Sequence, residues 1–207
     1  MAKQELGIYV HIPFCVKKCD YCDFISYPNK LEMQDEYTER IIEEIKSQED
    51  ILKTYEVTTI YIGGGTPSNI DSKNITKILT NIKQIICNQT QKEIEITIEV
   101  NPGTVSLEKL QDYKDAGINR LSIGLQSAEN ELLKQIGRIH NFEQFLETYQ
   151  MARKLGFKNI NVDLMLGLPN QKIKDLKNSL EKIIELHPEH ISVYSLIVED
   201  GTPFANK

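Results

Sequence analysis

The chain lacks the features by which several classes of protein are recognised. Its 207 residues contain no run of basic side chains, and 30 acidic residues outnumber 24 Lys and Arg, which gives a net charge of −6. Proteins that neutralise many phosphates need clustered cations, so we expect no nucleic acid among the partners. No apolar stretch approaches the roughly 20 residues of a membrane span, and the first residues resemble neither a signal peptide nor a transit helix. We therefore expect no integral membrane segment and a cytoplasmic location.

Cysteine is also scarce, and its distribution is uneven. Three of the four cysteines lie between positions 15 and 22, and Cys87 lies far along the chain. In the cytoplasm thiols stay reduced, so such a cluster favours metal binding or chemistry over disulfide formation.

Short β-branched runs alternate with longer amphipathic segments, a pattern typical of βα units that build a parallel sheet. The alternation predicts one compact α/β domain over residues 1–207, a partial (β/α)6 barrel of the TIM-like kind. Its working face is then the set of loops at the carboxyl ends of the strands. The six expected strands are Leu6–His11, Thr58–Gly63, Ile94–Val100, Arg120–Gly124, Asn159–Met165 and Ile191–Leu196. The expected helices run through Tyr37, Ile41 and Ile45, from Ile75 to Ile86, and over Leu107–Ala116, Phe142–Leu155 and Ile173–Leu186.

The strongest chemical signal is a loop of three thiols, Cys15, Cys19 and Cys22, directly after the first expected strand. Thiolate is the soft ligand that iron–sulfur clusters require, and a tight loop can wrap three sulfurs around one [4Fe-4S] cube. Because the cube has four irons, three cysteines leave one iron free for a substrate or cofactor.

A zinc site is the alternative interpretation of the same residues, with His11 completing a Cys3His set. Structural zinc usually takes its ligands in two separated pairs, whereas all these candidates belong to one strand and its loop. A lone histidine such as His11 is more often a hydrogen-bonded core residue. Cys87 ends an apolar helical stripe, so we expect a small buried hydrophobe there rather than a fourth ligand.

A second signal is the glycine run Gly63–Gly65 with Thr66 and Pro67, at the end of the second expected strand. Such a loop lets its backbone approach a ligand closely, although a tight βα turn explains the glycines about as well. Polar residues follow later strands too, and helix caps or satisfied buried groups are the alternative for each. These residues are Glu99, Asn101, Gln126, Ser127 and Asp163. Asp163 lies in an apolar strand that we expect to be covered on both faces, so it needs a partner such as a ligand hydroxyl or Arg138.

Taken together these residues resemble the radical S-adenosylmethionine (SAM) proteins related to oxygen-independent coproporphyrinogen III oxidase. Tyr9–Phe14 leading into the three cysteines is similar to the opening signature of that family. The later matching segments are Gly63–Pro67, Glu99–Pro102, Arg120–Ser127, Asp163–Pro169 and Ile191–Tyr194. The resemblance covers essentially the whole chain and implies a partial barrel of the radical SAM type.

The resemblance implies two cofactors, a [4Fe-4S] cluster held by the three cysteines and SAM chelated to the open iron. One electron passed through the cluster would cleave the sulfonium to methionine and a 5′-deoxyadenosyl radical. Tyr9 and Tyr21 are then expected beside the cluster and cofactor. Gly64, Gly65 and Thr66 are expected at the methionine end and Ile197 near the adenine. The polar contacts to ribose and methionine groups are expected from Glu99, Gln126, Arg138 and Asp163.

Two departures from the oxidase pattern favour the branch of the family regarded as haem chaperones, which pass haem to an acceptor protein. Phe24 stands where the oxidase has a further cysteine, and only 14 residues precede Cys15, where the oxidase has a long segment. The expected partners are a haem or porphyrinogen ligand, an electron donor such as a flavodoxin or ferredoxin, and an unidentified haem acceptor. Radical decarboxylation of coproporphyrinogen III propionates to vinyl groups remains the enzymatic alternative, and a zinc-stabilised barrel fragment is the third interpretation. Family members continue into a C-terminal domain, so we expect this chain to be a truncated or partial member.

We predict that Cys19→Ala loses the brown cluster chromophore, because two thiolates cannot hold the cube. Cys87→Ala is the matched control and should keep it. Absorption spectra and iron content after anaerobic purification measure both. Full iron content in both variants would show that the ligand assignment is wrong.

Overall fold

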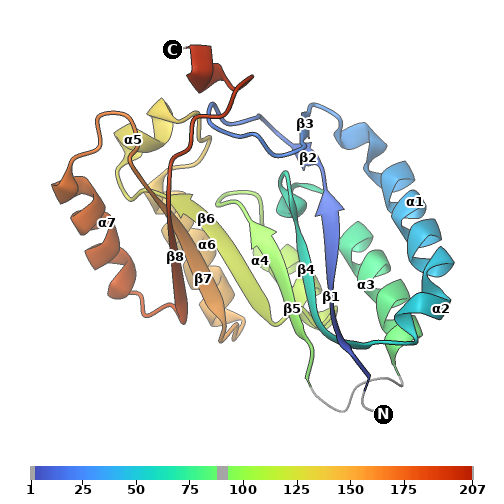
Figure 1. The fold of residues 1–207 in the computed structure, drawn as a ribbon. Helices are drawn as coiled ribbons and strands as arrows, with labels where there is room; N and C mark the ends of the chain where they lie inside the picture. The colour runs from blue at the N-terminus through green and yellow to red at the C-terminus, as the bar shows by residue number, and fades with distance from the viewer. Residues whose placement is uncertain (1–2, 88–92, 207) are drawn as a thin grey trace.

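The computed structural model describes residues 3–87 and 93–206, and its centre is one parallel sheet in the strand order β1-β4-β5-β6-β7-β8. The six strands expected from the sequence are all present. They are β1 (Glu5–Ile12), β4 (Glu56–Gly64), β5 (Glu95–Val100), β6 (Arg120–Gln126), β7 (Ile160–Leu166) and β8 (His190–Ser195). The sheet curves without closing, because β1 and β8 form its two edges (Figure 1). The fold is thus a partial (β/α)6 barrel.

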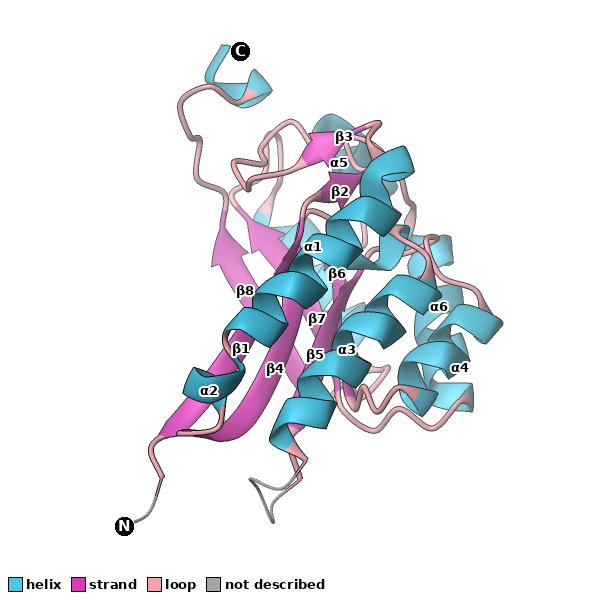
Figure 2. Cartoon of the chain, turned by 90° about the vertical axis from the view of Figure 1, so that its right-hand side faces the viewer, coloured by secondary structure: helices cyan, strands magenta, loops and turns pink. Residues whose placement is uncertain are grey.

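Helices connect successive strands and pack on the outer, convex face of the sheet (Figures 1 and 2). The five expected helices are α1 (Gln34–Ser47), α3 (Ser72–Ile86), α4 (Leu107–Asp115), α6 (Phe142–Lys154) and α7 (Ile173–Ile184). The sequence patterns did not predict the short α2 (Glu49–Leu52) and α5 (Asn130–Gln135), nor a two-stranded sheet of β2 (Phe14–Cys15) and β3 (Tyr27–Pro28). Ser106 caps α4 by accepting a hydrogen bond from the backbone N–H of Lys109. No helix among the described residues is long and apolar enough to cross a bilayer.

The two faces of the sheet differ in chemistry because successive side chains of a strand point to opposite sides. Those on the convex face are aliphatic and lie in the main core with the apolar stripes of the helices; examples are Ile62, Ile98, Ile123 and Val162, all fully buried. The concave face carries a polar set instead, namely Tyr61, Glu99, Ser122, Asp163 and Tyr194. The expectation that the strand of Asp163 is covered on both faces is confirmed at most positions, since Asn161 and Met165 on the concave face are buried and Asp163 itself is partly exposed. The concave face thus carries the polar side chains at the ends of the strands.

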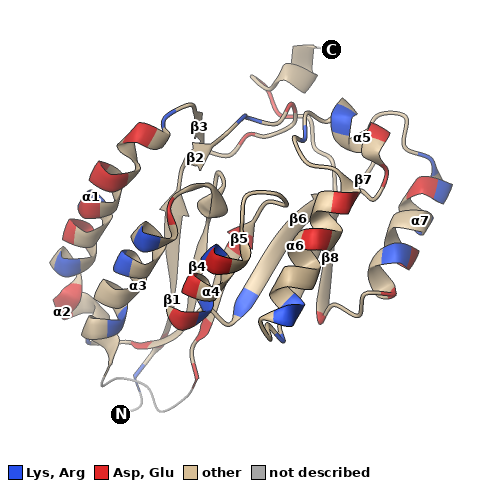
Figure 3. Ribbon diagram, turned by 180° about the vertical axis from the view of Figure 1, so that it is seen from behind, with Lys and Arg blue, Asp and Glu red and all other residues tan. Residues whose placement is uncertain are grey.

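Charged side chains of both signs are concentrated on the helices (Figure 3). On the outer surface Lys73 and Lys77 of α3 pair with Asp35 and Glu39 of α1, at 3.4 and 3.0 Å. Such exposed pairs contribute little to stability, so the helices are held mainly by their apolar stripes.

A different set of cations lies at the amino-terminal edge of the sheet and joins the long helices α3, α4, α6 and α7. Lys83 of α3 donates to the backbone carbonyl of Ala116 at the end of α4, at 2.5 Å, and Lys114 of α4 donates to that of Leu155 at the end of α6. Arg153 of α6 in turn donates to the carbonyl of His187 after α7, at 2.8 Å. The last carbonyls of a helix have no partner within it and carry partial negative charge. The ends of α4, α6 and α7 are therefore each capped by a cation from a long helix earlier in the sequence.

We predict that Lys83→Met lowers the free energy of unfolding by about 1 kcal/mol, because the carbonyl of Ala116 loses its cationic partner. Urea unfolding at neutral pH measures the change. Lys134→Met is the control, since that lysine pairs only with exposed Glu131 on the surface of α5. An equal loss in both variants would contradict a capping role.

Candidate functional site

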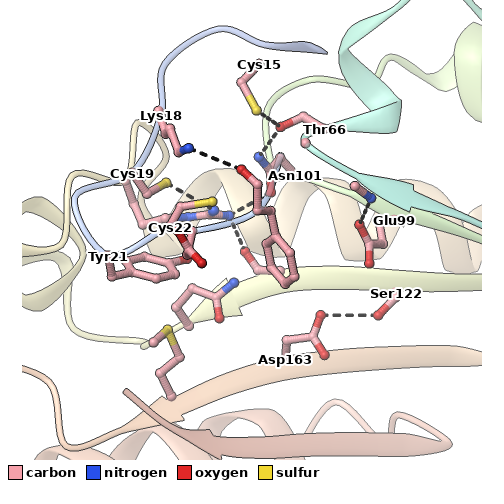
Figure 4. A pocket seen from close by; sticks show the side chains of 18 of the residues that line it. Cys15, Lys18, Cys19, Tyr21, Cys22, Thr66, Glu99, Asn101, Ser122 and Asp163 are labelled. Atoms are coloured by element: carbon pink, nitrogen blue, oxygen red, sulfur yellow. Dashed lines mark hydrogen bonds between the residues drawn. The ribbon is translucent and has the colours of Figure 1, made fainter. Parts of the chain in front are cut away.

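A cavity of about 560 Å³ opens at the carboxyl ends of the strands, on the concave side. Three segments build it: the cysteine loop, the glycine loop after β4, and the polar ends of β5 to β8. Side chains from all three point into it (Figure 4). Its lining includes Cys15, Cys19, Tyr21, Cys22, Gly64, Gly65, Thr66, Glu99, Asn101, Ser122, Gln126, Arg138, Asp163, Tyr194 and Ile197.

The cysteine loop is folded so that all three cysteines reach this cavity. The loop begins at β2 and ends at β3, which pair in the separate two-stranded sheet, and there the N–H of Tyr27 donates to the carbonyl of Pro13 at 2.7 Å. Its middle is anchored across the cavity by the N–H of Asp20, which donates to the carbonyl of Ile136 at 3.2 Å. Cysteines that are up to seven positions apart in the sequence thus face a common space.

The thiols of this loop favour a positively charged occupant. Burial raises the pKa of the Cys22 thiol, and charge on Cys19 and Cys15 raises it further, whereas the backbone N–H of Phe24 and the cation of Lys18 lower it. Several thiolates close together therefore need a cation, which bound iron supplies. The donor set fits an iron–sulfur cluster.

The glycine loop lies directly against the cysteine loop. The N–H groups of Gly65 and Thr66 donate to the carbonyls of Ile12 and Phe14, each at 2.9 Å. A Cβ on Gly65 would lie 2.9 Å from Cys15 Sγ, which is closer than real Cβ contacts allow. Close approach of the cysteine loop therefore requires glycine at position 65.

His11 does not complete a zinc site with the cysteines. Its Nδ1 lies 3.2 Å from the hydroxyl of Tyr9, and its Nε2 lies 2.8 Å from the carbonyl of Ile25, so both ring nitrogens have other partners. Among the described residues no three His, Cys, Asp or Glu side chains converge closely enough to hold a single metal ion. A [4Fe-4S] cluster requires a different arrangement, because each cysteine thiolate binds a different iron of the cluster.

Two carboxylates lie on the concave face with separate partners. Glu99 accepts from the hydroxyl of Tyr61 at 2.9 Å and from the N–H of Gly64 at 3.1 Å. Asp163 accepts from Ser122 at 3.2 Å and from Asn161 at 2.8 Å, so its protein partners are these two and not Arg138. Burial raises the pKa of both carboxyl groups. Each retains oxygen lone pairs for a ligand that donates hydrogen bonds.

Arg138 supplies a cation to the same space. Its Nη2 donates to Asn101 Oδ1 and to the carbonyl of Gly124, both at 2.7 Å, and its Nη1 lies 3.7 Å from Cys19 Sγ. The Nε is buried without a hydrogen-bond partner. A buried unpaired donor on a cation fits an anionic group such as a carboxylate.

The structure brings nearly all of the expected site residues together. The three cysteines and nine of the ten expected cofactor residues line the cavity. Tyr9 is outside the lining, 58% exposed, with its ring stacked on that of Tyr61 at 6.1 Å between centroids. Cys87 lies away from the cavity as expected, but it is exposed rather than buried, because it follows the last turn of α3 and its Sγ donates to the carbonyl of Gln84.

Some residues of the cavity were not expected as site residues. Asn101 was noted as a polar residue after a strand, whereas Tyr61, Ser122 and Tyr194 were not singled out. Tyr194 donates to Gln126 Oε1 at 2.8 Å and so positions an expected residue. Period-two alternation of polar residues in the strands would have identified all three, since each points to the concave face. Ser127 does not line the cavity; its hydroxyl oxygen accepts a hydrogen bond from the backbone N–H of Glu129, two residues later, at 3.1 Å.

His140 is a buried residue behind the cavity wall. Its Nε2 lies 3.2 Å from the carbonyl of Leu125, and its Nδ1 has no partner. Because Arg138 is close and the site is buried, the neutral ring is favoured. Burial first, and the charge of Arg138 second, lower the pKa of His140 to about 3.

Comparison with known families gives a match over most of the chain. The model of the radical SAM superfamily matches residues 9–183. The heme chaperone HemW of Bacillus subtilis is 42% identical over 200 residues, which are 96% of this chain and 52% of that protein. HemW of Buchnera aphidicola from Schizaphis graminum is 41% identical over 200 residues, with the same shares of the two chains. The chain thus spans about half the length of these curated relatives.

Among solved structures, coproporphyrinogen III oxidase (HemN) of Escherichia coli, described as a radical SAM enzyme, superposes with a TM-score of 0.85. It is 29% identical, and the match covers 95% of this chain and 45% of the oxidase.

We predict that acid destabilises the protein partly through His140. Above pH 6.5 the His140 ring is neutral in the folded and in the unfolded protein. Between pH 6.5 and about pH 3 the ring is protonated in the unfolded protein but stays neutral in the folded protein. The free energy of unfolding should therefore fall by up to about 1.4 kcal/mol per pH unit in this window. His140→Gln cannot protonate, so urea unfolding at several pH values should show a shallower decline.

The matched control is His187→Asn, which replaces an exposed histidine at positive φ with a residue that tolerates that conformation. Identical pH slopes for His140→Gln and the wild type would contradict the prediction.

Proposed function

The chain belongs to the radical SAM superfamily, and from this premise we propose that it binds a [4Fe-4S] cluster and SAM and acts in haem transfer to an acceptor protein. The observation that carries the proposal is the single cavity shared by three cysteines, the glycine loop and the polar strand ends.

Cys15, Cys19 and Cys22 are the proposed cluster ligands. All three line the cavity, and bound iron would relieve the cost of placing several thiolates together. Three protein ligands would leave one iron of the cluster available for SAM. When bound, the cluster supplies the electron for reductive cleavage of the SAM sulfonium bond.

SAM is proposed to occupy the remainder of the cavity. Gly64, Gly65 and Thr66 would hold its methionine end. Charge complementarity assigns the SAM carboxylate to the guanidinium of Arg138. The other polar contacts would come from Glu99, Gln126 and Asp163, whose oxygens accept from hydroxyl and ammonium groups. Tyr21 and Ile197 line the cavity, where Tyr21 would lie beside the cluster and Ile197 near the adenine, whereas Tyr9 would act from outside, through the ring of Tyr61.

The haem chaperone role is supported by the relatives. Two curated relatives named heme chaperone HemW are 41 and 42% identical to this chain, against 38% for the coproporphyrinogen-III oxidase-like protein HemZ of Bacillus subtilis and 29% for the solved oxidase. Phe24, rather than a further cysteine, follows the cluster motif. The proposed partners are haem, an electron donor such as a flavodoxin or ferredoxin, and a haem acceptor, in the cytoplasm where thiols stay reduced.

The test uses the chain after anaerobic reconstitution. We expect about four irons and four sulfides per chain, SAM binding by calorimetry, and hemin binding that is followed by transfer to an apo-haemoprotein such as apomyoglobin. About one zinc with no iron or sulfide would exclude the cluster. Formation of protoporphyrinogen IX from coproporphyrinogen III would instead favour the oxidase function.

One variant tests the SAM site directly. Asp163→Asn should weaken SAM binding about tenfold with unchanged iron content, because charge-assisted hydrogen bonds to the ligand are lost. Asp50→Asn, on the exposed surface of α2, is the matched control. Equal SAM affinity in all three proteins would remove Asp163 from the proposed site.

A further inference from the structure

A continuous hydrogen-bond chain connects two of the three cysteine sulfurs across the cavity (Figure 4). Cys15 Sγ lies 3.4 Å from Thr66 Oγ1, and Thr66 Oγ1 accepts from Asn101 Nδ2 at 3.1 Å. On its other side Asn101 Oδ1 accepts from Arg138 Nη2 at 2.7 Å, and Arg138 Nη1 donates toward Cys19 Sγ at 3.7 Å. Asn101 is the middle member of this chain.

The direction of every hydrogen bond in the chain follows from Arg138. A guanidinium can only donate, so the carbonyl end of the Asn101 amide must face it. The amide nitrogen then faces Thr66 and donates to its oxygen. The hydroxyl hydrogen of Thr66 is thereby left to point at Cys15 Sγ. The sulfurs of Cys15 and Cys19, at the two ends of this series of hydrogen bonds, therefore each receive a hydrogen bond. The Asn101 amide links the direction fixed at Arg138 to the direction of the Thr66 hydroxyl.

Asn101 is also held in place by its own backbone. Its N–H donates to Ser68 Oγ at 3.0 Å, and its carbonyl accepts from Thr104 Oγ1 at 2.7 Å. Ser68 and Thr104 contact each other at 2.6 Å. The amide oxygen and nitrogen of Asn101 thus both have protein partners, on a backbone fixed at the end of β5.

We propose that Asn101 is a positioning residue that orients Thr66 and Arg138 as hydrogen-bond donors to the Cys15 and Cys19 thiolates, and so raises the reduction potential of the cluster. The inference rests on the proposed function, because it requires a cluster on these cysteines. One-electron reduction makes the cluster more negative, and donors to its sulfur ligands stabilise that state. Cys22 is not part of this series of hydrogen bonds.

The test is the midpoint potential of the cluster, without SAM. Reconstituted protein takes one electron per cluster from titanium(III) citrate, which is oxidised to titanium(IV), and electron paramagnetic resonance follows the reduced cluster. Thr66→Val removes the hydroxyl that donates to Cys15, and Asn101→Leu removes the amide that orients both donors. Both variants should shift the midpoint to lower potential at wild-type iron and sulfide content.

The double variant gives a second criterion. Because Asn101 acts partly through Thr66, Thr66→Val combined with Asn101→Leu should shift the potential by less than the sum of the single shifts. Asn81→Ala is the control; its side chain donates only to the carbonyl of Lys77, on the outer side of α3, and its midpoint should equal that of the wild type.

The outcomes separate the two proposals. A wild-type chain that takes up no iron and sulfide overturns the proposed function and this inference with it. A fully loaded wild type with an unshifted midpoint in Asn101→Leu, or with strictly additive shifts, overturns the inference alone. If Asn101→Leu loses its cluster, Thr66→Val decides, and an unshifted midpoint there overturns the inference.

Discussion

The close contact between the cysteine loop and the glycine loop is the constraint on which the site depends. The backbone of Gly65 lies against Cys15 Sγ at a distance that admits no side chain. Two further backbone hydrogen bonds, from Gly65 and Thr66, attach this loop to residues on either side of Pro13. Cys15 is thus positioned by backbone contacts between the two loops, next to the ends of β4 and β5.

The chemistry of the sheet makes room for this arrangement. The convex face and its helices contain the apolar core, so the concave face does not have to be apolar to stabilise the fold. The free-energy cost of placing Glu99 and Asp163 on the concave face is moderate, because each carboxyl group accepts two hydrogen bonds from its neighbours. Successive side chains of a β-strand point to opposite faces, so residues that stabilise the core alternate along each strand with residues that line the site.

The sequence was sufficient for the strands, the long helices, the cysteine loop and most of the cavity lining, because those rest on local periodicity and on recognisable motifs. It could not show that His11 has both nitrogens occupied, that Asp163 pairs with Ser122 and Asn161, or that Asn101 joins Thr66 to Arg138. These contacts link residues that are up to 41 positions apart and depend on strand register. The exposure of Cys87 was missed for a local reason, since one step beyond the buried Ile86 turns the side chain away from the sheet.

The cations that cap the ends of α4, α6 and α7 all come earlier in the sequence than the helix end that they cap. Lys83, Lys114 and Arg153 each cap a helix that comes later in the sequence than their own. During synthesis the N-terminal part of a protein leaves the ribosome first. Each of these helix ends therefore emerges when the side chain that completes it has already been made, so the barrel can be assembled in the order of translation.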